Sequence, residues 1–318
     1  MTESQSRLCA KLYNDLGQEI IAYLSDKDIH EIMLNPDGQL WVDSVSTGQK
    51  QVGSLSRAQA FSILHSVAGI NNFVVSPHIP RLEAQLPYYK ALQGQRFTGQ
   101  IPPIVASPCF TLRKKSESVF TLEDYVLTGR LTEAQSNVLK NLVSSRQNIL
   151  VCGGPGTGKT TVTNALIVEA VKTDPQQRFL ILEDTPELQC KAPNQVSLVT
   201  SHEVTMTDLV RIAMRMRPDR LLMGEVRGAE ALDMLKAWNT GCPGGICTVH
   251  ANGCEEALQR MLDLSMEAGL LSPPVALILH TIHAVVSVKR NGHQKGFISE
   301  ILSVTGVKNN DIQFKKLA

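Results

Sequence analysis

A glycine-rich segment that follows an apolar run carries the most specific chemistry in the sequence. Gly153, four further residues, and then Gly158, Lys159 and Thr160 follow the pattern of a phosphate-binding loop. Glycines let the backbone curl so that several N–H groups point toward phosphate oxygens, and the helix that follows adds its positive N-terminal end. We therefore expect nucleotide to be bound by Gly153, Gly154, Pro155, Gly156, Thr157, Gly158, Lys159, Thr160 and Thr161.

Three side chains at the end of this loop have distinct expected tasks. The ammonium group of Lys159 is long enough to reach the β- and γ-phosphates of ATP. The hydroxyl of Thr160 is expected to coordinate Mg²⁺, and Thr161 packs beside or contacts the α-phosphate. The loop therefore predicts ATP and Mg²⁺ as the ligands.

Hydrolysis also needs a carboxylate to orient or deprotonate water, and the loop supplies none. Glu225 follows the apolar run 220–223, which is a predicted strand. An aspartate usually ends this strand in P-loop proteins and holds Mg²⁺ through water, whereas here that place is Gly224. We expect Glu225 to take this metal-side role through a bound water.

A second acidic cluster consists of Glu183, Asp184 and Glu187, which follow the apolar run 179–182. Ligands bind at the carboxyl ends of parallel strands, where these residues are expected. One such acid could equally be a solvated loop charge, but two acidic groups that end two strands beside a P-loop favour catalysis. The residues alone leave open whether Glu187 or Glu225 is the general base.

His250 ends another apolar run, and its expected place at the same sheet edge predicts a sensor of the γ-phosphate. A lone histidine is more often structural, so this hypothesis depends on the strand position. Cys242, Cys247 and Cys254 together with His250 offer a zinc site as an alternative. The spacing lacks a Cys-x2-Cys pair, and a strand would splay these side chains, which argues against zinc.

The second part of the chain alternates between strand and helix patterns. Such alternation predicts βαβ units and an α/β fold, with a mostly parallel sheet that carries helices on both faces. The expected elements are a helix at 132–144, a strand at 147–152, a helix from Lys159, a strand at 178–184, a helix at 207–216, a strand at 220–225, a helix at 228–239 and a strand at 245–250.

The first part of the chain predicts a smaller α+β domain. Leucine and isoleucine recur at helical spacing from Arg7 to Leu24, and Ser56 is placed to cap a helix that runs to about Ile70. The turn signal Asn35–Gly38 joins two strand-like runs into an expected hairpin, and three short strands are expected at 81–88, 95–102 and 109–115. We expect antiparallel strands with helices on one face and a boundary near residue 128, which gives domains 1–128 and 129–318.

Composition limits the classes of protein that this chain can belong to. Its 318 residues are 43% hydrophobic and 19% charged, which is ordinary for a globular protein with a core. The N-terminus lacks the apolar core of a signal peptide, and the longest apolar run, 274–288, is too short to span a membrane and is expected to be a buried strand or helix. Seven unpaired cysteines predict reduced thiols in a cytoplasmic protein, with only peripheral membrane contact.

Four motifs in this order resemble those of the secretion traffic ATPases of type IV secretion, type II secretion and type IV pili. They are GGPGTGKT, LEDTPELQ, MRMRPDRLLMGEVRGAEA and TGCPGGICTVHANG, and they correspond to the P-loop, the acidic box, the degenerate Walker B motif and the histidine box of that family. The phrase MLNPDGQLWVD in the first domain is most similar to the conjugal-transfer branch. The tetracysteine site of the type II branch is missing.

The resemblance implies a RecA-like ATPase domain after a PAS-like domain, in a homohexamer that is peripherally bound at the cytoplasmic face of the inner membrane beside type IV secretion components. Nucleotide would lie between the two domains. Glu187 would match the water-activating glutamate, and Glu225 and His250 would match the Walker B and histidine-box residues. Arg96 and Arg113 would match arginines that reach phosphate from the first domain, whereas Arg215 and Arg217 could instead act across a subunit interface.

Four other functions compete with ATP-driven conjugative secretion. A degenerate Walker B motif permits a nucleotide-gated switch with little hydrolysis, and a pilus or type II secretion motor would share the same motifs. Net charge +1 and the absence of a basic stripe with interleaved aromatics argue against direct DNA binding by a nucleic-acid motor; 112–116 is the one short basic cluster. A small-molecule kinase would need an acceptor pocket that the sequence does not reveal.

Overall fold

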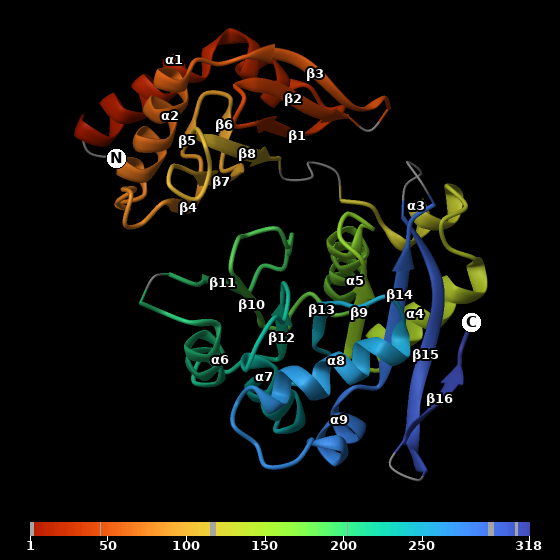
Figure 1. Cartoon of the computed structure of the whole chain (residues 1–318). Coiled ribbons are helices and arrows are strands. Elements are labelled where there is room, and N and C mark those ends of the chain that lie inside the picture. Colours follow the sequence, from red (N-terminus) through yellow and green to blue (C-terminus); the bar gives the residue numbers. More distant parts are fainter. Residues whose placement is uncertain (1–2, 45, 115–118, 202, 292–295, 309–310) are drawn as a thin grey trace. The chain divides into compact units, whose positions relative to one another are not determined.

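The structure is a computed structural model that describes residues 3–44, 46–114, 119–201, 203–291, 296–308 and 311–318. The chain forms two compact units, Met1–Glu117 and Ser118–Ala318 (Figure 1). The helix α3 (Leu122–Leu127) belongs to the second unit, because Leu122 and Tyr125 are buried in the core of that unit. The expected boundary after residue 128 would have placed α3 in the first unit.

The N-terminal unit is an antiparallel sheet with two helices. The helices are α1 (Glu3–Ser25) and α2 (Arg57–Ile70), and Ser56 caps α2 through a bond from the Gln59 amide. The sheet contains, in spatial order, β3 (Gly48–Ser54), β2 (Gln39–Ser44), β1 (Ile29–Leu34), β8 (Cys109–Arg113), β7 (Arg96–Gln100) and β4 (Arg81–Gln85). The short strands β5 (Tyr88–Tyr89) and β6 (Leu92–Gln93) pair with each other.

Successive side chains along these strands point to opposite faces of the sheet, one of which packs against the helices while the other carries no described helix. The residues that point toward α1 and α2 are apolar and buried, for example Ile32, Phe97 and Leu112. The expected hairpin is present, since β1 and β2 pair across the Asn35–Gly38 turn, where Gly38 has φ 84°. Such a positive φ is the reason for glycine at this position.

The C-terminal unit is built on a mostly parallel sheet. Its strands, in spatial order, are β11 (Gln195–Val199), β10 (Phe179–Glu183), β12 (Arg220–Met223), β13 (Ile246–His250), β9 (Ile149–Gly153), β14 (Ala284–Lys289), β15 (Phe297–Lys308) and β16 (Asp311–Lys316). The first six pair in parallel, and β15 and β16 add an antiparallel hairpin at one edge. The chain therefore has the predicted class, a RecA-like α/β domain preceded by a smaller α+β domain.

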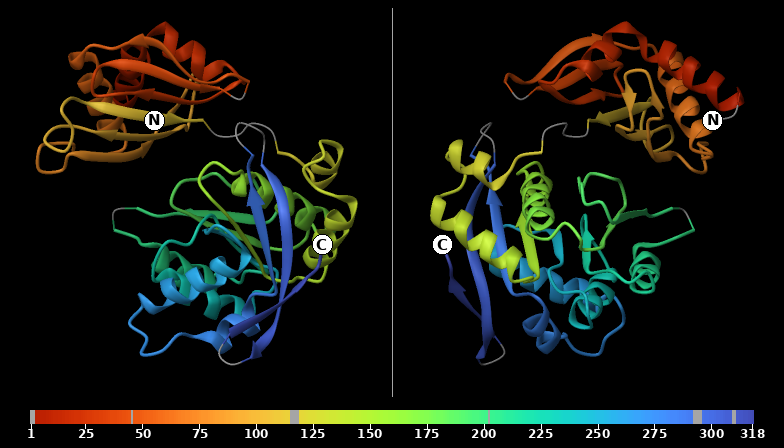
Figure 2. Two further views of the ribbon diagram at one scale, coloured as in Figure 1. Left: turned by 45° about the vertical axis from the view of Figure 1, so that its right-hand side comes forward. Right: turned by 180° about the vertical axis from the view of Figure 1, so that it is seen from behind.

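Helices cover both faces of this sheet (Figure 2). One face packs against α3, α4 (Glu133–Ser144) and α5 (Lys159–Thr173). The other face packs against α6 (Met206–Met214), α7 (Glu230–Asn239), α8 (Cys254–Met266) and α9 (Val275–Thr281). Neighbouring strand residues point to opposite faces, so Leu150 packs in one core and Val151 in the other. Every residue of β9, β10 and β12 is buried, which is typical of parallel strands between two helix layers.

The buried arginine Arg220 joins three separate segments at one end of this sheet. Arg220, the first residue of β12, is 1% exposed, and its guanidinium donates to Val143 O at 2.9 Å, to Gly244 O at 3.0 Å and to the Gln177 side chain. These acceptors come from the end of α4 and from two loops. The sequence does not reveal this role, because a lone arginine before a strand is usually solvated.

The apolar run 274–288 contains both elements that were considered for it, since α9 is followed by β14. Among the described residues, no helix combines the length and apolar character that crossing a bilayer requires.

Candidate functional site

The predicted phosphate-binding loop forms a closed turn between β9 and α5. Gly156 and Gly158 have φ values of 66° and 94°, which side chains with a Cβ rarely adopt. The Thr157 hydroxyl donates to Gly154 O at 2.9 Å, and Lys159 Nζ donates to Gly153 O at 3.0 Å and to Gly154 O at 3.1 Å. The loop backbone thus wraps around the lysine side chain.

The other predicted loop residues surround this turn. Pro155 and Gly156 are exposed at its tip, while Thr160 and Thr161 are half-buried in the first turn of α5. α5 begins at Lys159, so its unpaired N–H groups and the positive end of its dipole, which attract anions, directly follow the loop.

Sheet order brings the predicted catalytic residues to one edge. β12, β13 and β9 are neighbours, and the parallel register sets His250 beside Gly153. Gly224 and Glu225 follow β12, and the Gly224 amide donates to Leu182 O at the end of β10. The carboxyl ends of β10, β12 and β13 therefore carry the acidic residues and the histidine beside the loop.

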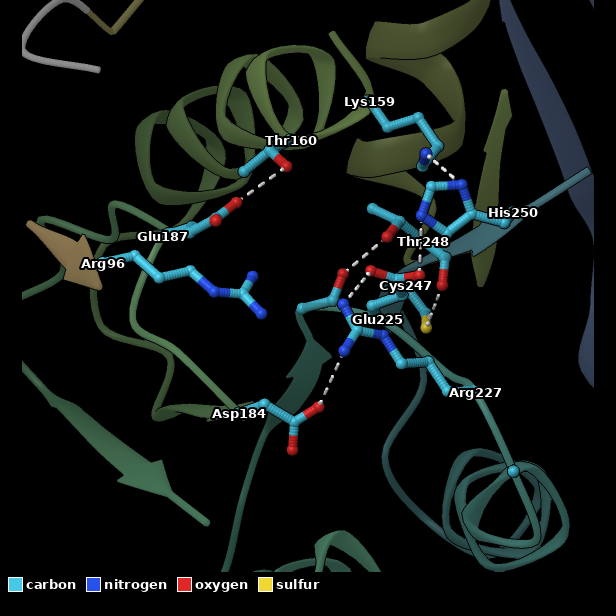
Figure 3. A network of polar contacts seen from close by, with 12 residues as sticks. Arg96, Lys159, Thr160, Asp184, Glu187, Glu225, Arg227, Cys247, Thr248 and His250 are labelled. Carbon is cyan, nitrogen blue, oxygen red and sulfur yellow. Dashed lines mark hydrogen bonds and ion pairs between the residues drawn. The ribbon is translucent and has the colours of Figure 1, made fainter. Parts of the chain in front are cut away.

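His250 connects the loop to Glu225, as Figure 3 shows. Its Nδ1 lies 3.1 Å from Lys159 Nζ, and its Nε2 lies 3.0 Å from Glu225 Oε1. An ammonium group can only donate, so Nδ1 accepts from Lys159 and the imidazole hydrogen lies on Nε2, which faces Glu225 within ion-pair distance. This arrangement requires a neutral imidazole.

The surroundings of His250 favour the same neutral form. Burial lowers the pKa of His250, and the positive charges of Lys159 and Arg227 lower it further, whereas Glu225 raises it. Burial is the largest of these effects on the pKa, although 47% of the side chain remains exposed.

Glu225 is held from two sides. Its second oxygen, Oε2, accepts from Arg227 Nη2 at 2.9 Å, and Arg227 Nη1 lies 3.8 Å from Asp184 Oδ2 (Figure 3). A cavity of about 210 Å³ adjoins Glu225 and His250. Arg227 therefore links the ends of β10 and β12, a role that the sequence analysis missed even though it stands in the Walker B phrase.

The acidic box contacts the P-loop helix through Glu187. The Thr160 hydroxyl donates to Glu187 Oε2 at 3.3 Å, and Asn164 Nδ2 donates to Glu187 O at 3.3 Å. Asn164 is 4% exposed and lies one helical turn after Thr160 on α5. This spacing is the signal that would have identified Asn164 from the sequence.

The same acidic segment is bound by Glu183, the last residue of β10. Glu183 is 2% exposed, and its Oε1 accepts from the amides of Glu187 and Leu188, both at 2.8 Å. Glu183 therefore bonds to backbone groups of the acidic box, whereas Glu187 presents its carboxylate to the P-loop helix.

The oxygen groups near Thr160 fit the expected magnesium ion. Mg²⁺ prefers hydroxyl, carboxylate and water oxygens, and the Thr160 hydroxyl and the Glu187 carboxylate are already adjacent. The oxygens of Glu225 instead lie within ion-pair distance of His250 and Arg227. The zinc alternative would need Cys247, which is fully buried in β13 with a pKa raised by burial.

Arg96 and Arg113 lie in the N-terminal unit on neighbouring strands. The register of β7 and β8 sets them directly opposite each other. Their chain neighbours Phe97 and Leu112 point into the helix-covered core, so the two arginines occupy the helix-free face. Arg96 Nη2 lies 3.8 Å from Glu83 Oε2. Arg215 and Arg217 precede β12, at the strand end opposite to Glu225.

This fold and this site define a P-loop nucleotide-binding protein of the RecA-like class. The model of the type II/IV secretion system protein family matches residues 18–312, and the chain belongs to this family. It is 40% identical to the conjugal transfer protein TrbB of Rhizobium radiobacter, over 99% of this chain and 96% of that protein. It is 42% identical to the probable conjugal transfer protein TrbB of Sinorhizobium fredii, over 90% of this chain and 87% of that one.

Solved structures of related proteins share the fold. The VirB11 ATPase of the Brucella suis type IV secretion system, solved in complex with sulphate, is 26% identical with a TM-score of 0.50, and the match covers 95% of this chain and 97% of that chain. The pilus retraction motor PilT with bound ADP is 16% identical with a TM-score of 0.64, over 94% of this chain and 81% of that chain. The second likeness supports the fold alone.

Proposed function

We propose that this protein hydrolyses Mg-ATP to power conjugative type IV secretion, the transfer of plasmid DNA between cells. The observation that carries the proposal is the Lys159–His250–Glu225 connection, with Glu187 beside Thr160, at the edge where a P-loop holds phosphate. The similarity to conjugal transfer proteins over nearly the whole chain supports the secretion process.

Each polar group then has a task in phosphoryl transfer. Lys159 leaves the loop carbonyls to bind the β- and γ-phosphates, and the α5 amides hold the remaining oxygens. Glu187 orients and deprotonates the attacking water, while neutral His250 keeps Glu225 at the γ-phosphate end of the loop. Thr160, and Glu225 through a water molecule, would hold a Mg²⁺ ion, which would supply positive charge beside the phosphates. Arg96 and Arg113 supply further positive charge from the N-terminal unit.

The working form is a homohexamer that associates peripherally with inner-membrane components of the secretion system. In this proposal ATP binding closes the N-terminal unit onto the C-terminal unit, and loss of phosphate releases it. Repeated closure would deliver work to the secretion machinery. Direct DNA binding is not part of the proposal, because the net charge of +1 provides no field for it.

Replacing Lys159 by alanine tests the proposal. Lys159→Ala should abolish ATP hydrolysis by the purified protein while thermal unfolding remains cooperative, because the lysine stabilises the transferring phosphoryl group. Lys172→Ala is the matched control, since Lys172 lies at the other end of α5 with its side chain 65% exposed. Wild-type turnover in Lys159→Ala would overturn the assignment, and a native mass below a ring of six subunits would overturn the hexamer.

A nucleotide-gated switch is the second candidate. Glu225 contacts His250 and Arg227 rather than Thr160, so the Walker B carboxylate is engaged away from the expected metal position. If the protein binds ATP tightly and shows no turnover with or without membranes, the switch replaces the motor.

A further inference from the structure

Glu183 ends a buried strand in the C-terminal unit and makes contacts that an ordinary loop acid does not make. Its side chain is 2% exposed, and one carboxylate oxygen accepts two backbone bonds of 2.8 Å, from Glu187 and Leu188. Bonds from backbone N–H groups to a carboxylate are charge-assisted and strong. Glu183 therefore fixes the backbone of the residue whose side chain reaches Thr160.

The second support of this segment comes from α5. Asn164 donates to Glu187 O at 3.3 Å and accepts from the Gln189 amide at 2.8 Å. Glu187 is thus bound through its amide on the β10 side and through its carbonyl on the α5 side. A backbone held at both ends leaves the Glu187 carboxylate little freedom other than its own rotamers.

Gly224 stands directly beside Glu183. The strands β10 and β12 are parallel neighbours, with Leu182 opposite Met223, so the next residues of the two strands are adjacent. A Cβ added to Gly224 would lie 3.1 Å from Glu183 Cγ and 3.4 Å from Oε1. An aspartate, which usually ends this strand in P-loop proteins, would also place a second carboxylate beside the first.

We infer that Glu183 is a positioning residue for hydrolysis, which holds Glu187 at the P-loop helix, and that Gly224 is glycine because the Glu183 side chain occupies the adjacent space. The glycine of the degenerate Walker B motif then leaves room for Glu183, a residue of the acidic box. Glu183 acts through the backbone of Glu187 and does not touch nucleotide. The inference depends on the proposed function only for the role of Glu187 in hydrolysis.

The first experiment measures amide hydrogen exchange at Glu187 and Leu188 in the nucleotide-free protein. Glu183→Ala should raise the exchange rates of these two amides, and Glu183→Gln should raise them less because its amide oxygen can still accept. Glu203→Ala is the control, since Glu203 is an exposed acid of the same unit. Unchanged exchange at both amides in Glu183→Ala would overturn the inference, whatever the protein hydrolyses.

The second experiment separates turnover from nucleotide binding. Glu183→Ala should lower kcat by about 10- to 100-fold, because small displacements of a catalytic group cost rates of this order. The Kd for ATP should stay within about twofold, because the P-loop donors and Lys159 are untouched. Equal losses of affinity and turnover would indicate general damage to the fold instead. Full kcat in Glu183→Ala beside an active wild type would reject the positioning role alone, whereas an inactive wild type would reject the proposed function.

A double-mutant cycle tests the pairing with Gly224. Gly224→Ala alone should lower kcat, because its Cβ presses on Glu183. In Glu183→Ala the space is empty, so adding Gly224→Ala should cost nothing further. Losses that multiply would show that Gly224 is glycine for another reason. If Glu183→Ala does not fold, as judged by thermal unfolding, the cycle is run with Glu183→Gln. The tight contact remains in that variant, so the double variant should lose more than Glu183→Gln alone.

Discussion

At the scale of single residues, His250 is the most informative side chain of the site. It faces a cation through one ring nitrogen and a carboxylate through the other, and only its neutral form satisfies both. The sequence places a histidine at this strand end, but the strand order decides what it contacts. Because β13 lies between β12 and β9, the imidazole lies between Glu225 and Lys159.

Replacing the two charged neighbours of His250 should shift its pKa in opposite directions. We expect an NMR titration of wild-type protein to give a pKa below the ordinary value of about 6.5. Lys159→Met should raise this pKa, because a neighbouring positive charge is removed, and Glu225→Gln should lower it further. Shifts in the reverse directions would contradict the proposed contacts.

The lowered pKa also has a consequence for stability. The unfolded chain takes up a proton at about pH 6.5, before the folded chain does, so the contribution of His250 to the free energy of unfolding is complete above that pH. It is lost as the pH falls from there through the folded pKa. His283, whose pKa is lowered by burial and whose Nδ1 accepts from the Asn148 amide, adds to the same acid-side loss.

At the scale of elements, the predictable parts were those with strong periodicity or clear caps. The hairpin of β1 and β2, the capped helices α2 and α4, and the buried strands β9, β10, β12 and β13 were expected from the sequence and are present. The helix α3, the strand β11 and the β15–β16 hairpin were not expected. In β11 only Val196 and Leu198 are partly shielded from solvent, and the other three residues are exposed.

The sequence predicts which residues form the site better than it predicts which of them contact one another. Motif spacing gives the residues that gather at the carboxyl edge, but the pairing of Glu187 with Thr160 and of Glu225 with His250 depends on which strands are neighbours. Glu183 accepts from the amides four and five residues further along the chain, and Asn164 contacts the Glu187 carbonyl. The sequence places these residues near the site but does not show that they bond to the backbone there.

Arg220 provides the prediction at the element scale. Arg220→Met should lower the free energy of unfolding by about 2–4 kcal/mol, because three buried oxygens each lose a bond from the guanidinium. Denaturant unfolding measures the change. Arg211→Met is the control, since the Arg211 side chain is 67% exposed and its ion pair with Asp233 at 3.6 Å should contribute about 0–1 kcal/mol. Equal midpoints for the two variants would contradict the structural role of Arg220.

At the scale of the whole molecule, the chain divides its chemistry between two folds. The C-terminal unit holds the P-loop, both acidic groups and the histidine, whereas Arg96 and Arg113 belong to the N-terminal unit. If hydrolysis needs cations from that unit, then ATP turnover requires both folds, and a nucleotide-driven motion can be coupled to it.

Removing these arginines tests that coupling. Arg96→Ala and Arg113→Ala should each slow ATP hydrolysis by at least about tenfold, a conservative figure for a cation that stabilises phosphoryl transfer. Neither should lower the melting temperature, because both side chains lie outside the helix-covered core. Arg81→Ala is the control, from an exposed position on β4 of the same sheet. Turnover equal to that of the control would remove both arginines from the proposed mechanism.

The cross-strand placement of Arg96 and Arg113 has one more consequence. Directly opposed residues of an antiparallel pair have Cβ atoms about 4.5–5.5 Å apart, and two positive charges at such positions repel each other. Glu83 offsets part of this repulsion, since its carboxylate oxygen lies 3.8 Å from Arg96. An anion with several negative charges that bound between the two arginine side chains would offset the rest. Relief of the repulsion would then contribute to the affinity for such an anion.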